Sequence, residues 1–249
     1  MRPRKRFGQH FLRDPAVLKR IVEAIDPAPD DPVVEIGPGE GALTRPLLEK
    51  LVRLTVIEID RDLAARLTSG KLDVRCADAL DVDFSEFPRG LRVVGNLPYN
   101  ISTPILFHLA RYADRVRDMH FMLQLEVVER MVARPSTPEY GRLSVMLQTR
   151  FSMQKLFNVA AGAFWPPPKV ESAVVRLVPL AEKPACDEKV LERVVREAFS
   201  ARRKTLRNAL KLRPEVLEEL GLDEKLRPEN LSPTDYVRIS ARLISPKSP

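Results

Sequence analysis

The 249-residue chain is 44% hydrophobic and 30% charged, so it is long enough to bury a sizeable core. No apolar run approaches the ~20 residues that span a bilayer, and the basic N-terminus leads into no apolar segment. We therefore expect no membrane association and no signal peptide. Two cysteines and three scattered histidines indicate no disulfide framework and no metal site, and a cytoplasmic location is the default.

The formal net charge of +7 favours a polyanionic partner, and the basic residues are clustered. Residues 2–20 carry Arg2, Arg4, Lys5, Arg6, Arg13, Lys19 and Arg20, against Asp14 as the one acid. A second cluster without acids comprises Arg202, Arg203, Lys204, Arg207, Lys211 and Arg213. Such clusters are typical of nucleic-acid-binding proteins. The alternative is a solvated basic surface, but the absence of acids from residues 198–214 weighs against it.

The first expected elements form the start of a βαβ unit. An amphipathic helix is predicted over residues 15–25, with Asp14 as its N-cap and Pro15 in its first position. A short buried strand at 33–36 then leads into the turn Gly37-Pro38-Gly39-Glu40-Gly41 and a helix over 42–51. A strand, a glycine-rich turn and a helix in this order indicate a Rossmann-like arrangement.

Four expected strands end in residues that can bind a ligand. The strands at 33–36, 54–57, 74–76 and 91–95 lead to Gly37, Glu58, Asp78 and Asn96. In a parallel sheet these ends line one crevice. The GxGxG spacing differs from the GxGxxG of nicotinamide and flavin sites, which favours a ligand without a pyrophosphate, such as S-adenosylmethionine. Glu58 would then hold the ribose and Asp78 the adenine; the alternative is that both carboxylates only cap helices.

The sequence Asn96-Leu97-Pro98-Tyr99 directly follows the fourth of these strands. An amide oxygen and a neighbouring backbone carbonyl can accept two hydrogen bonds from one exocyclic amino group, and Tyr99 can stack on the ring that carries it. These are the groups needed to hold an adenine by its N6. A plain strand-to-helix turn is the alternative, because Asn and Pro are common turn residues.

The second half of the chain continues the alternation and then becomes helical. We predict helices at 102–112 (capped by Ser102), 126–132 and 143–151, and strands at 119–123, 156–159 and 173–177. The proline-rich loop at 164–172 would present Phe164 and Trp165 rigidly, either to the core or as a second jaw against a base. After a linker at 179–184, helices are expected at 189–199, 204–212, 214–220 and 234–243.

These motifs resemble those of the ribosomal RNA adenine N6,N6-dimethyltransferase family. The matching segments are residues 8–12 (Gly-Gln-His-Phe-Leu), 35–44, 56–60, 78–80, 95–102 and 164–172. Segments 140–145 and 198–208 resemble the branch that modifies small-subunit 16S rRNA. The resemblance implies an α/β, Rossmann-like S-adenosylmethionine-dependent methyltransferase domain with a basic N-terminal arm over 1–180. It also implies a helical rRNA-binding domain over 185–249.

The family also implies roles for individual residues. Donor contacts are expected from His10, Leu12, Gly37, Gly39, Glu58, Ile59, Asp78, Ala79 and Asn96. The catalytic residues would be Asn96, Leu97, Pro98, Tyr99 and Phe164, with the Leu97 carbonyl on the target N6 and Tyr99 and Phe164 against the base. His10 stands where many relatives have Asn.

The expected activity is dimethylation of two adjacent adenosines in a hairpin loop near the 3′ end of 16S rRNA, in the immature small subunit, by a monomeric enzyme. Arg203, Arg207 and Lys211 are spaced i, i+4 and i+8 on an expected helix, so they would share one face that grips rRNA phosphates. Three alternatives remain: a 23S rRNA dimethyltransferase of the macrolide-resistance type, an assembly factor whose catalysis is secondary, and a nicotinamide-dependent oxidoreductase. The last is disfavoured by the glycine spacing.

Overall fold

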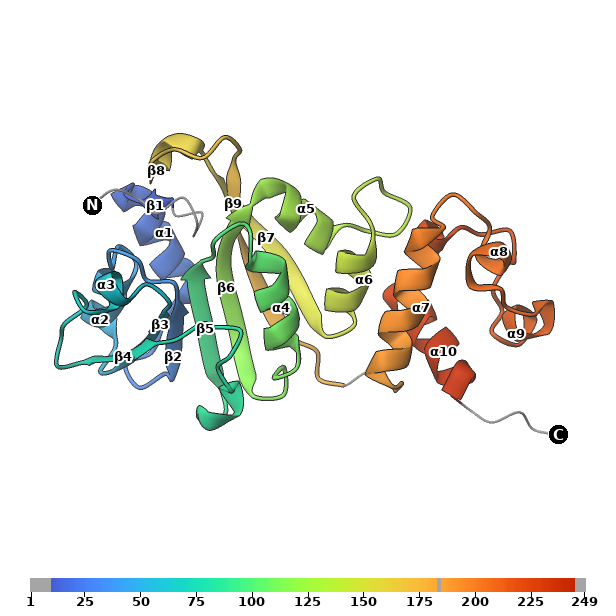
Figure 1. Ribbon diagram of the computed structural model, residues 1–249, viewed down its shortest axis with the longest axis horizontal. Helices are drawn as coiled ribbons and strands as arrows, with labels where there is room; N and C mark the ends of the chain where they lie inside the picture. The colour runs from blue at the N-terminus through green and yellow to red at the C-terminus, as the bar shows by residue number, and fades with distance from the viewer. Residues whose placement is uncertain (1–9, 183–184, 245–249) are drawn as a thin grey trace. The chain divides into compact units, whose positions relative to one another are not determined.

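The structure is a computed structural model that describes residues 10–182 and 185–244 (Figure 1). Most of the basic N-terminal arm, with Gly8 and Gln9, lies outside the described residues. The internal contacts divide the chain into two compact units. The first comprises residues 1–128 and 153–179, and the second comprises residues 129–152 and 180–249.

The first unit is built on a seven-stranded sheet with the order β4-β3-β2-β5-β6-β9-β7. Its strands are β2 (Val33–Ile36), β3 (Leu54–Glu58), β4 (Leu72–Cys76), β5 (Leu91–Asn96), β6 (Val116–Gln124), β7 (Phe151–Val159) and β9 (Ser172–Pro179). Strands β4, β3, β2, β5 and β6 are parallel, and β9 runs antiparallel to β6. The predicted α/β class with a mostly parallel sheet is confirmed.

Apolar helix faces cover this sheet. The helices of the first unit are α1 (Pro15–Ile25), α2 (Thr44–Lys50), α3 (Arg61–Ala64), α4 (Ser102–Ala110) and the start of α5 (Leu125–Val132). Ile21, Val22 and Ile25 of α1 and Leu47 of α2 join one core cluster with residues of β2, β3, β5 and β6. Helix α1 has the predicted bounds, and Asp14 caps it by accepting hydrogen bonds from the N–H groups of Ala16 and Val17.

Gly95 sets how closely β5 approaches β2 near their carboxyl ends. A Cβ at this position would collide with the backbone carbonyl oxygen of Ile36, although the φ of Gly95 is ordinary. The strands can approach this closely only because residue 95 has no side chain. The glycine therefore brings the end of β5, and with it Asn96, next to the glycine turn after β2.

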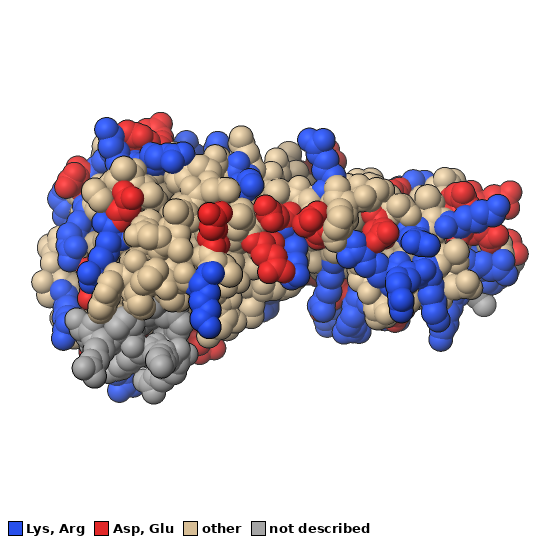
Figure 2. All heavy atoms as spheres, turned by 90° about the horizontal axis from the view of Figure 1, so that it is seen from above, with Lys and Arg blue, Asp and Glu red and all other residues tan. Residues whose placement is uncertain are grey.

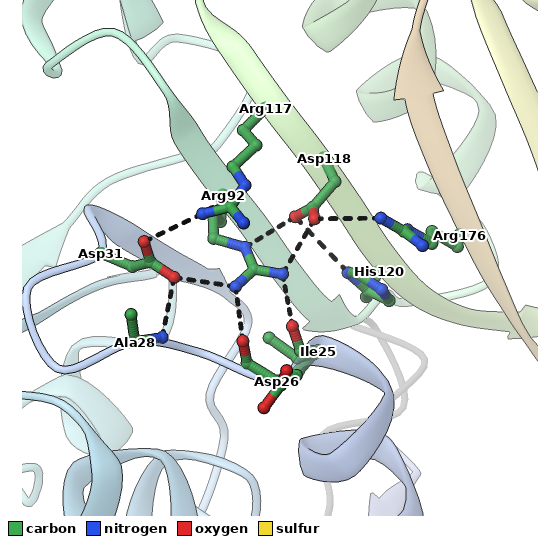
Figure 3. Close-up of polar contacts among 9 residues, drawn as sticks. All are labelled: Ile25, Asp26, Ala28, Asp31, Arg92, Arg117, Asp118, His120 and Arg176. Carbon is green, nitrogen blue, oxygen red and sulfur yellow. Dashed lines mark hydrogen bonds and ion pairs between the residues drawn. The ribbon is translucent and has the colours of Figure 1, made fainter.

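A buried polar network anchors the end of α1 to the sheet (Figure 3). The Arg92 guanidinium makes a two-pronged ion pair with Asp118, with its Nε and Nη2 each 2.8 Å from a carboxylate oxygen. It also donates to Asp31 Oδ2 at 2.8 Å and to the carbonyl oxygens of Ile25 and Asp26 at the end of α1. Arg92 thus satisfies two carboxylates and two helix-end carbonyls at once.

The charges within this network shift one another's protonation. Burial opposes the charge of Arg92, but Asp118 and Asp31 outweigh it and raise the pKa of the guanidinium. Burial would also raise the pKa of Asp31, but the Ala28 N–H and Arg92 hold it below its usual value. His120, 2% exposed with its Nδ1 3.7 Å from Asp118, has a pKa lowered to about 4, chiefly by burial. Its ring is therefore neutral at physiological pH.

A short two-stranded ribbon pairs β1 (Phe11–Leu12) with β8 (Phe164–Trp165). The strands run antiparallel, with Phe11 opposite Trp165 and Leu12 opposite Phe164. The sequence did not predict this pairing, because two-residue strands carry no periodicity. The ribbon connects the segment before α1 with the proline-rich loop.

The second unit is helical. It contains the end of α5 and the helices α6 (Arg142–Gln148), α7 (Glu188–Ser200), α8 (Leu206–Leu210), α9 (Pro214–Glu219) and α10 (Pro233–Ile244). The ring of Phe199 packs between Tyr140 and Tyr236, whose hydroxyls donate to the carbonyls of Leu231 and Pro228. Residues 129–152 therefore pack with the C-terminal helices, whereas the predicted boundary at residue 180 placed them in the first domain.

Two local predictions were wrong. Ser102 is the first residue of α4 rather than its cap, because Ile101 holds the N-cap position and the Ser102 hydroxyl donates to the Tyr99 carbonyl. The expected helix over 204–212 is only the five-residue α8. Thr205 is extended before it, and Lys211 has a left-handed backbone (φ 52°) after it.

Candidate active site

One cavity lies at the carboxyl ends of the parallel strands. It collects the residues predicted to bind the donor and those of the Asn96-Leu97-Pro98-Tyr99 segment. The predicted site residues that line it are His10, Leu12, Gly37, Gly39, Glu58, Ile59, Asp78, Ala79, Asn96, Leu97, Pro98 and Tyr99. Residues from four strand ends and from the segment before α1 therefore meet in a single site.

The glycine turn after β2 forms one wall. Gly37, Gly39 and Gly41 all have positive φ angles, between 58° and 79°, which L side chains rarely adopt. A Cβ on Gly39 would also lie 3.0 Å from the ring of Phe11, which packs over the turn. The turn is itself held by its backbone, since the N–H groups of Gly37 and Gly41 donate to the carbonyls of Ile57 and Pro38, both at 2.9 Å.

Glu58 and Asp78 are both fixed in place by backbone N–H groups. Glu58 accepts hydrogen bonds from the N–H of Gly39 at 3.0 Å and of Asp60 at 2.9 Å. Burial raises the pKa of Glu58, and these two N–H groups oppose that shift. Asp78 accepts from the N–H of Leu80 at 2.9 Å. Each carboxylate thus reaches the cavity in a defined orientation.

Glu35 is a site residue that the sequence reasoning did not single out. It is the third residue of β2, is 2% exposed and lines the cavity. Burial raises its pKa to about 8, with the charge of Glu58 adding to the shift; the Thr44 hydroxyl, which donates to Glu35 Oε2 at 2.7 Å, opposes it. At pH 7 the carboxyl therefore retains its proton, and a cation in the cavity would favour its release.

A hydrogen bond to the backbone fixes the orientation of the Asn96 amide. Its Nδ2 donates to the His10 carbonyl oxygen at 2.9 Å, so Oδ1 is the amide atom left to accept a hydrogen bond from a ligand. His10 is itself held, because its Nδ1–H donates to the Pro166 carbonyl at 2.7 Å and its ring stacks on Tyr99 at 5.6 Å between centroids. The segment before α1 and the proline-rich loop, both distant in sequence from residue 96, therefore help to orient the Asn96 oxygen.

The rest of the segment is equally constrained. The Leu97 N–H donates to the Met122 carbonyl at 3.2 Å, which ties the turn to β6. The Tyr99 hydroxyl lies 2.7 Å from the Ser172 hydroxyl. Burial raises the pKa of Tyr99, and the hydrogen bond with Ser172 opposes the shift. The tyrosine ring is thus a neutral, oriented surface in the cavity wall.

Phe164 does not lie in this cavity. It is 4% exposed and packs in the core cluster with residues such as Leu12 and Val159. The neighbouring Trp165 is on the other side of the ribbon and is 41% exposed. Of the two interpretations of the loop, the structure places Phe164 in the core and leaves Trp165 as the exposed aromatic.

The basic residues expected to share a helix face do not do so. Arg203 precedes α8, Arg207 lies within it, and Lys211 follows it. All three are exposed, and Arg207 pairs with Glu224 at 3.2 Å. Lys and Arg side chains nevertheless gather on the surface of this unit, at the right of Figure 2.

Arg202 differs from its neighbours because it serves the packing of the second unit. Its Nε lies 2.5 Å from Glu229, and its Nη2 donates to the Pro138 carbonyl at 2.9 Å. The acid-free appearance of this cluster in the sequence is therefore misleading, since Glu224 and Glu229 reach it from other segments.

Residues 10–182 and 185–244 contain neither a cluster of metal-ligand side chains nor a membrane-spanning helix. No three His, Cys, Asp or Glu side chains there are grouped as metal ligands. No helix in the same residues is both long and apolar enough to cross a membrane.

Comparison with known proteins places this fold among the Rossmann-like methyltransferases. A dimethyladenosine transferase from Plasmodium falciparum superposes with a TM-score of 0.82 at 30% identity, covering 92% of this chain and 96% of that one. The 23S rRNA methyltransferase ErmE superposes with a TM-score of 0.73 at 29% identity, covering 94% of this chain and all of that one.

Sequence comparison identifies the family to which the chain belongs. The model of the ribosomal RNA adenine dimethylase family matches residues 1–245, and the chain belongs to this family. It is 58% identical to the ribosomal RNA small subunit methyltransferase A of Chromobacterium violaceum, over 97% of this chain and 95% of that protein. The same identity holds for the protein of that name from Thiobacillus denitrificans, over 97% and 98%.

Proposed function

We propose that this enzyme uses S-adenosylmethionine to dimethylate N6 of two adjacent adenosines in a hairpin loop near the 3′ end of 16S rRNA. The proposed substrate is the immature small subunit, and the enzyme acts as a cytoplasmic monomer. The 58% identity to small-subunit methyltransferases over nearly the whole chain supports this RNA over 23S rRNA. The chemistry is supported chiefly by the Asn96 amide. Its nitrogen donates to the His10 carbonyl, so the amide oxygen is available to a ligand.

The cavity fits the proposed donor. The glycine turn forms the wall beside which the amino-acid end would lie, and Glu58 and Asp78 offer oriented carboxylates to the ribose and adenine. S-adenosylmethionine supplies an electrophilic sulfonium methyl group. Binding and orienting this group is the part of the reaction that we assign to the residues at the carboxyl ends of β2, β3 and β4.

The acceptor half of the site acts on the target base. Adenine N6 is a poor nucleophile because its lone pair is delocalised into the ring. Hydrogen bonds from N6–H to Asn96 Oδ1 and to the Leu97 carbonyl favour a more tetrahedral nitrogen, and Tyr99 supports the ring. Positioning and electrostatics then supply most of the acceleration, and the methylated ammonium loses its proton to water. The adenosine must leave its loop to enter this site.

The direct test is mass spectrometry of 16S and 23S rRNA from a strain that lacks the gene. Loss of dimethyladenosine from the 16S hairpin loop, restored by the wild-type gene, supports the proposal. Loss from 23S rRNA instead would assign the enzyme to the macrolide-resistance type. A strain that expresses an inactive Asn96 variant separates catalysis from a role in assembly, because an assembly factor would restore growth without restoring the modification.

Donor binding is expected to strengthen with pH between about 6 and 8. The unliganded site holds a proton on Glu35, whose pKa is about 8, and a cationic donor favours its removal. Because the bound state carries fewer protons, affinity rises with pH through this window by at most about tenfold per unit and levels off above pH 8. Calorimetry at several pH values measures this change.

Glu35→Gln is the matched variant for this prediction. The glutamine retains an acceptor for the Thr44 hydroxyl but has no proton to release. Its donor affinity should be nearly independent of pH. If the wild type and this variant show the same pH profile, Glu35 does not couple to the donor.

Changing Arg203, Arg207 and Lys211 together to Gln is expected to weaken binding to the subunit without affecting donor affinity. The three exposed cations are proposed to contact rRNA phosphates, although they do not share one helix face. The slope of log affinity against log salt should fall by up to about 2–3 units, roughly one per lost phosphate contact. Arg242→Gln is a suitable control, because it removes an ion-paired cation of the same unit, 2.7 Å from Glu219, that lies outside the Arg203–Lys211 segment. A triple variant with an unchanged salt slope would show that the cluster is only a solvated surface.

A further inference from the structure

The β1–β8 ribbon places an exposed tryptophan beside the active-site cavity. Leu12 and Phe164, opposite each other, are both buried, whereas Phe11 and Trp165 form the next cross-strand pair on the other face. Phe11 lines the cavity and packs over Gly39. Trp165 is therefore next to a cavity-lining residue, yet it is 41% exposed.

The indole ring of Trp165 is paired with a cation. The guanidinium carbon of Arg13 lies 4.6 Å from the centroid of the ring, and the side chain of Arg13 is 54% exposed. The position is defined by the backbone, since the Arg13 N–H donates to the Ala163 carbonyl at 2.8 Å. Arg13 Nη2 also lies 3.6 Å from Glu40 of the glycine turn, so the pair is connected to the cavity wall.

We propose that Trp165 and Arg13 form a stacking platform for an unpaired nucleotide next to the target adenosine. The proposal rests on the proposed function, in which the target base enters the cavity and its neighbours in the strand stay outside. An exposed aromatic ring with an adjacent guanidinium fits that neighbour, because the ring stacks on a base and the cation attracts the phosphate. A protein partner would use the apolar ring but would not need the cation or an unpaired base.

Trp165 is the single tryptophan of the chain, so its fluorescence reports on this platform alone. The full-length protein is titrated with an RNA hairpin that carries adjacent adenosines in its loop. The loop RNA should quench the fluorescence at saturation, because a base stacks on the indole. A fully paired duplex of the same length should bind without this quenching. Equal quenching by both RNAs, or none by the hairpin although it binds, would overturn the platform.

Substitutions test the same point by a second readout. Trp165→Ala should raise the KM for the hairpin about five- to a hundredfold, the range for loss of one stacked base, while the Kd for S-adenosylmethionine stays unchanged. Trp165→Phe should recover part of the loss, and Arg13→Gln should raise the KM and reduce the salt dependence. Val170→Ala is the control, because Val170 is a 46% exposed apolar residue of the same loop.

The outcomes separate the platform from the proposed function. If Trp165→Ala methylates the hairpin with the KM of the wild type, the platform is wrong and the proposed function stands. If the wild-type enzyme methylates neither 16S rRNA nor the hairpin, the proposed function fails. The fluorescence titration still tests the platform in that case, because it does not depend on turnover.

Discussion

Replacing Asn96 by alanine is expected to slow methyl transfer about 10²–10³-fold, the usual loss when one preorganised transition-state hydrogen bond is removed. The Asn96 oxygen is the amide atom left to the substrate, because the nitrogen is committed to the His10 carbonyl. Its hydrogen bond strengthens as N6 becomes tetrahedral, so the effect falls on the rate and not on binding. Single-turnover methylation measures the rate, and fluorescence titration measures RNA affinity, which should change only a few-fold.

A second substitution at Asn96 and a control at a neighbouring residue test the role of the amide. Asn96→Asp retains an oxygen toward the cavity but cannot donate to the His10 carbonyl, so it should also be slow. Asn100→Ala, at an exposed position of the same turn, should methylate normally. Transfer by Asn96→Asp at the rate of the wild type would show that the contact with His10 does not orient the amide. Transfer by Asn96→Ala within a few-fold of the wild type would exclude Asn96 from catalysis.

The sequence was sufficient to predict the features that depend on local capping and on the order of parallel strands. Helix α1 begins and ends where its cap and proline indicated, because Asp14 satisfies the first N–H groups within the same segment. The order of strand ends predicted one cavity, since parallel strands bring their carboxyl ends to the same edge. Gly37, Glu58, Asp78 and Asn96 indeed line it together.

The errors occur where distant segments decide. The repeat of Arg203, Arg207 and Lys211 favoured a long helix, but the Leu206 N–H donates to the Leu226 carbonyl and α8 is short. Such a contact leaves no trace in a local periodic pattern. Pairing with β1 likewise determines that Phe164 is buried and Trp165 is exposed. Two-residue strands give no sequence signal by which the buried and the exposed aromatic can be told apart.

The role of Glu35 was also beyond sequence reasoning. In the sequence, Glu35 is a single polar residue within an otherwise apolar strand, and this pattern alone does not indicate a function. Its pKa is raised by burial and by the nearby charge of Glu58, which belongs to the adjacent strand. Only the folded sheet brings these carboxyls together, so only the structure shows that one of them holds its proton at neutral pH.

Arg92→Ala is expected to have the largest effect on stability, a loss of about 3–5 kcal/mol in the free energy of unfolding of the first unit. The substitution leaves the buried carboxylate of Asp118 without its two-pronged partner and removes the donors to the carbonyls of Ile25 and Asp26. Arg92→Lys should recover little of this loss, because an ammonium cannot reproduce a fork that contacts both sides of the network.

Urea unfolding followed by Trp165 fluorescence measures this loss, since Trp165 lies in the same unit as Arg92. Arg117→Ala is the matched control. It removes an arginine that also pairs with Asp31, at 3.2 Å, but whose side chain is 59% exposed. Solvent screening limits such a pair to less than about 1 kcal/mol. If Arg92→Ala were as mild as Arg117→Ala, the network in Figure 3 would not be what holds α1 to β5 and β6. A large difference between the two arginines would show that burial, and not the number of ion pairs, determines what this network contributes.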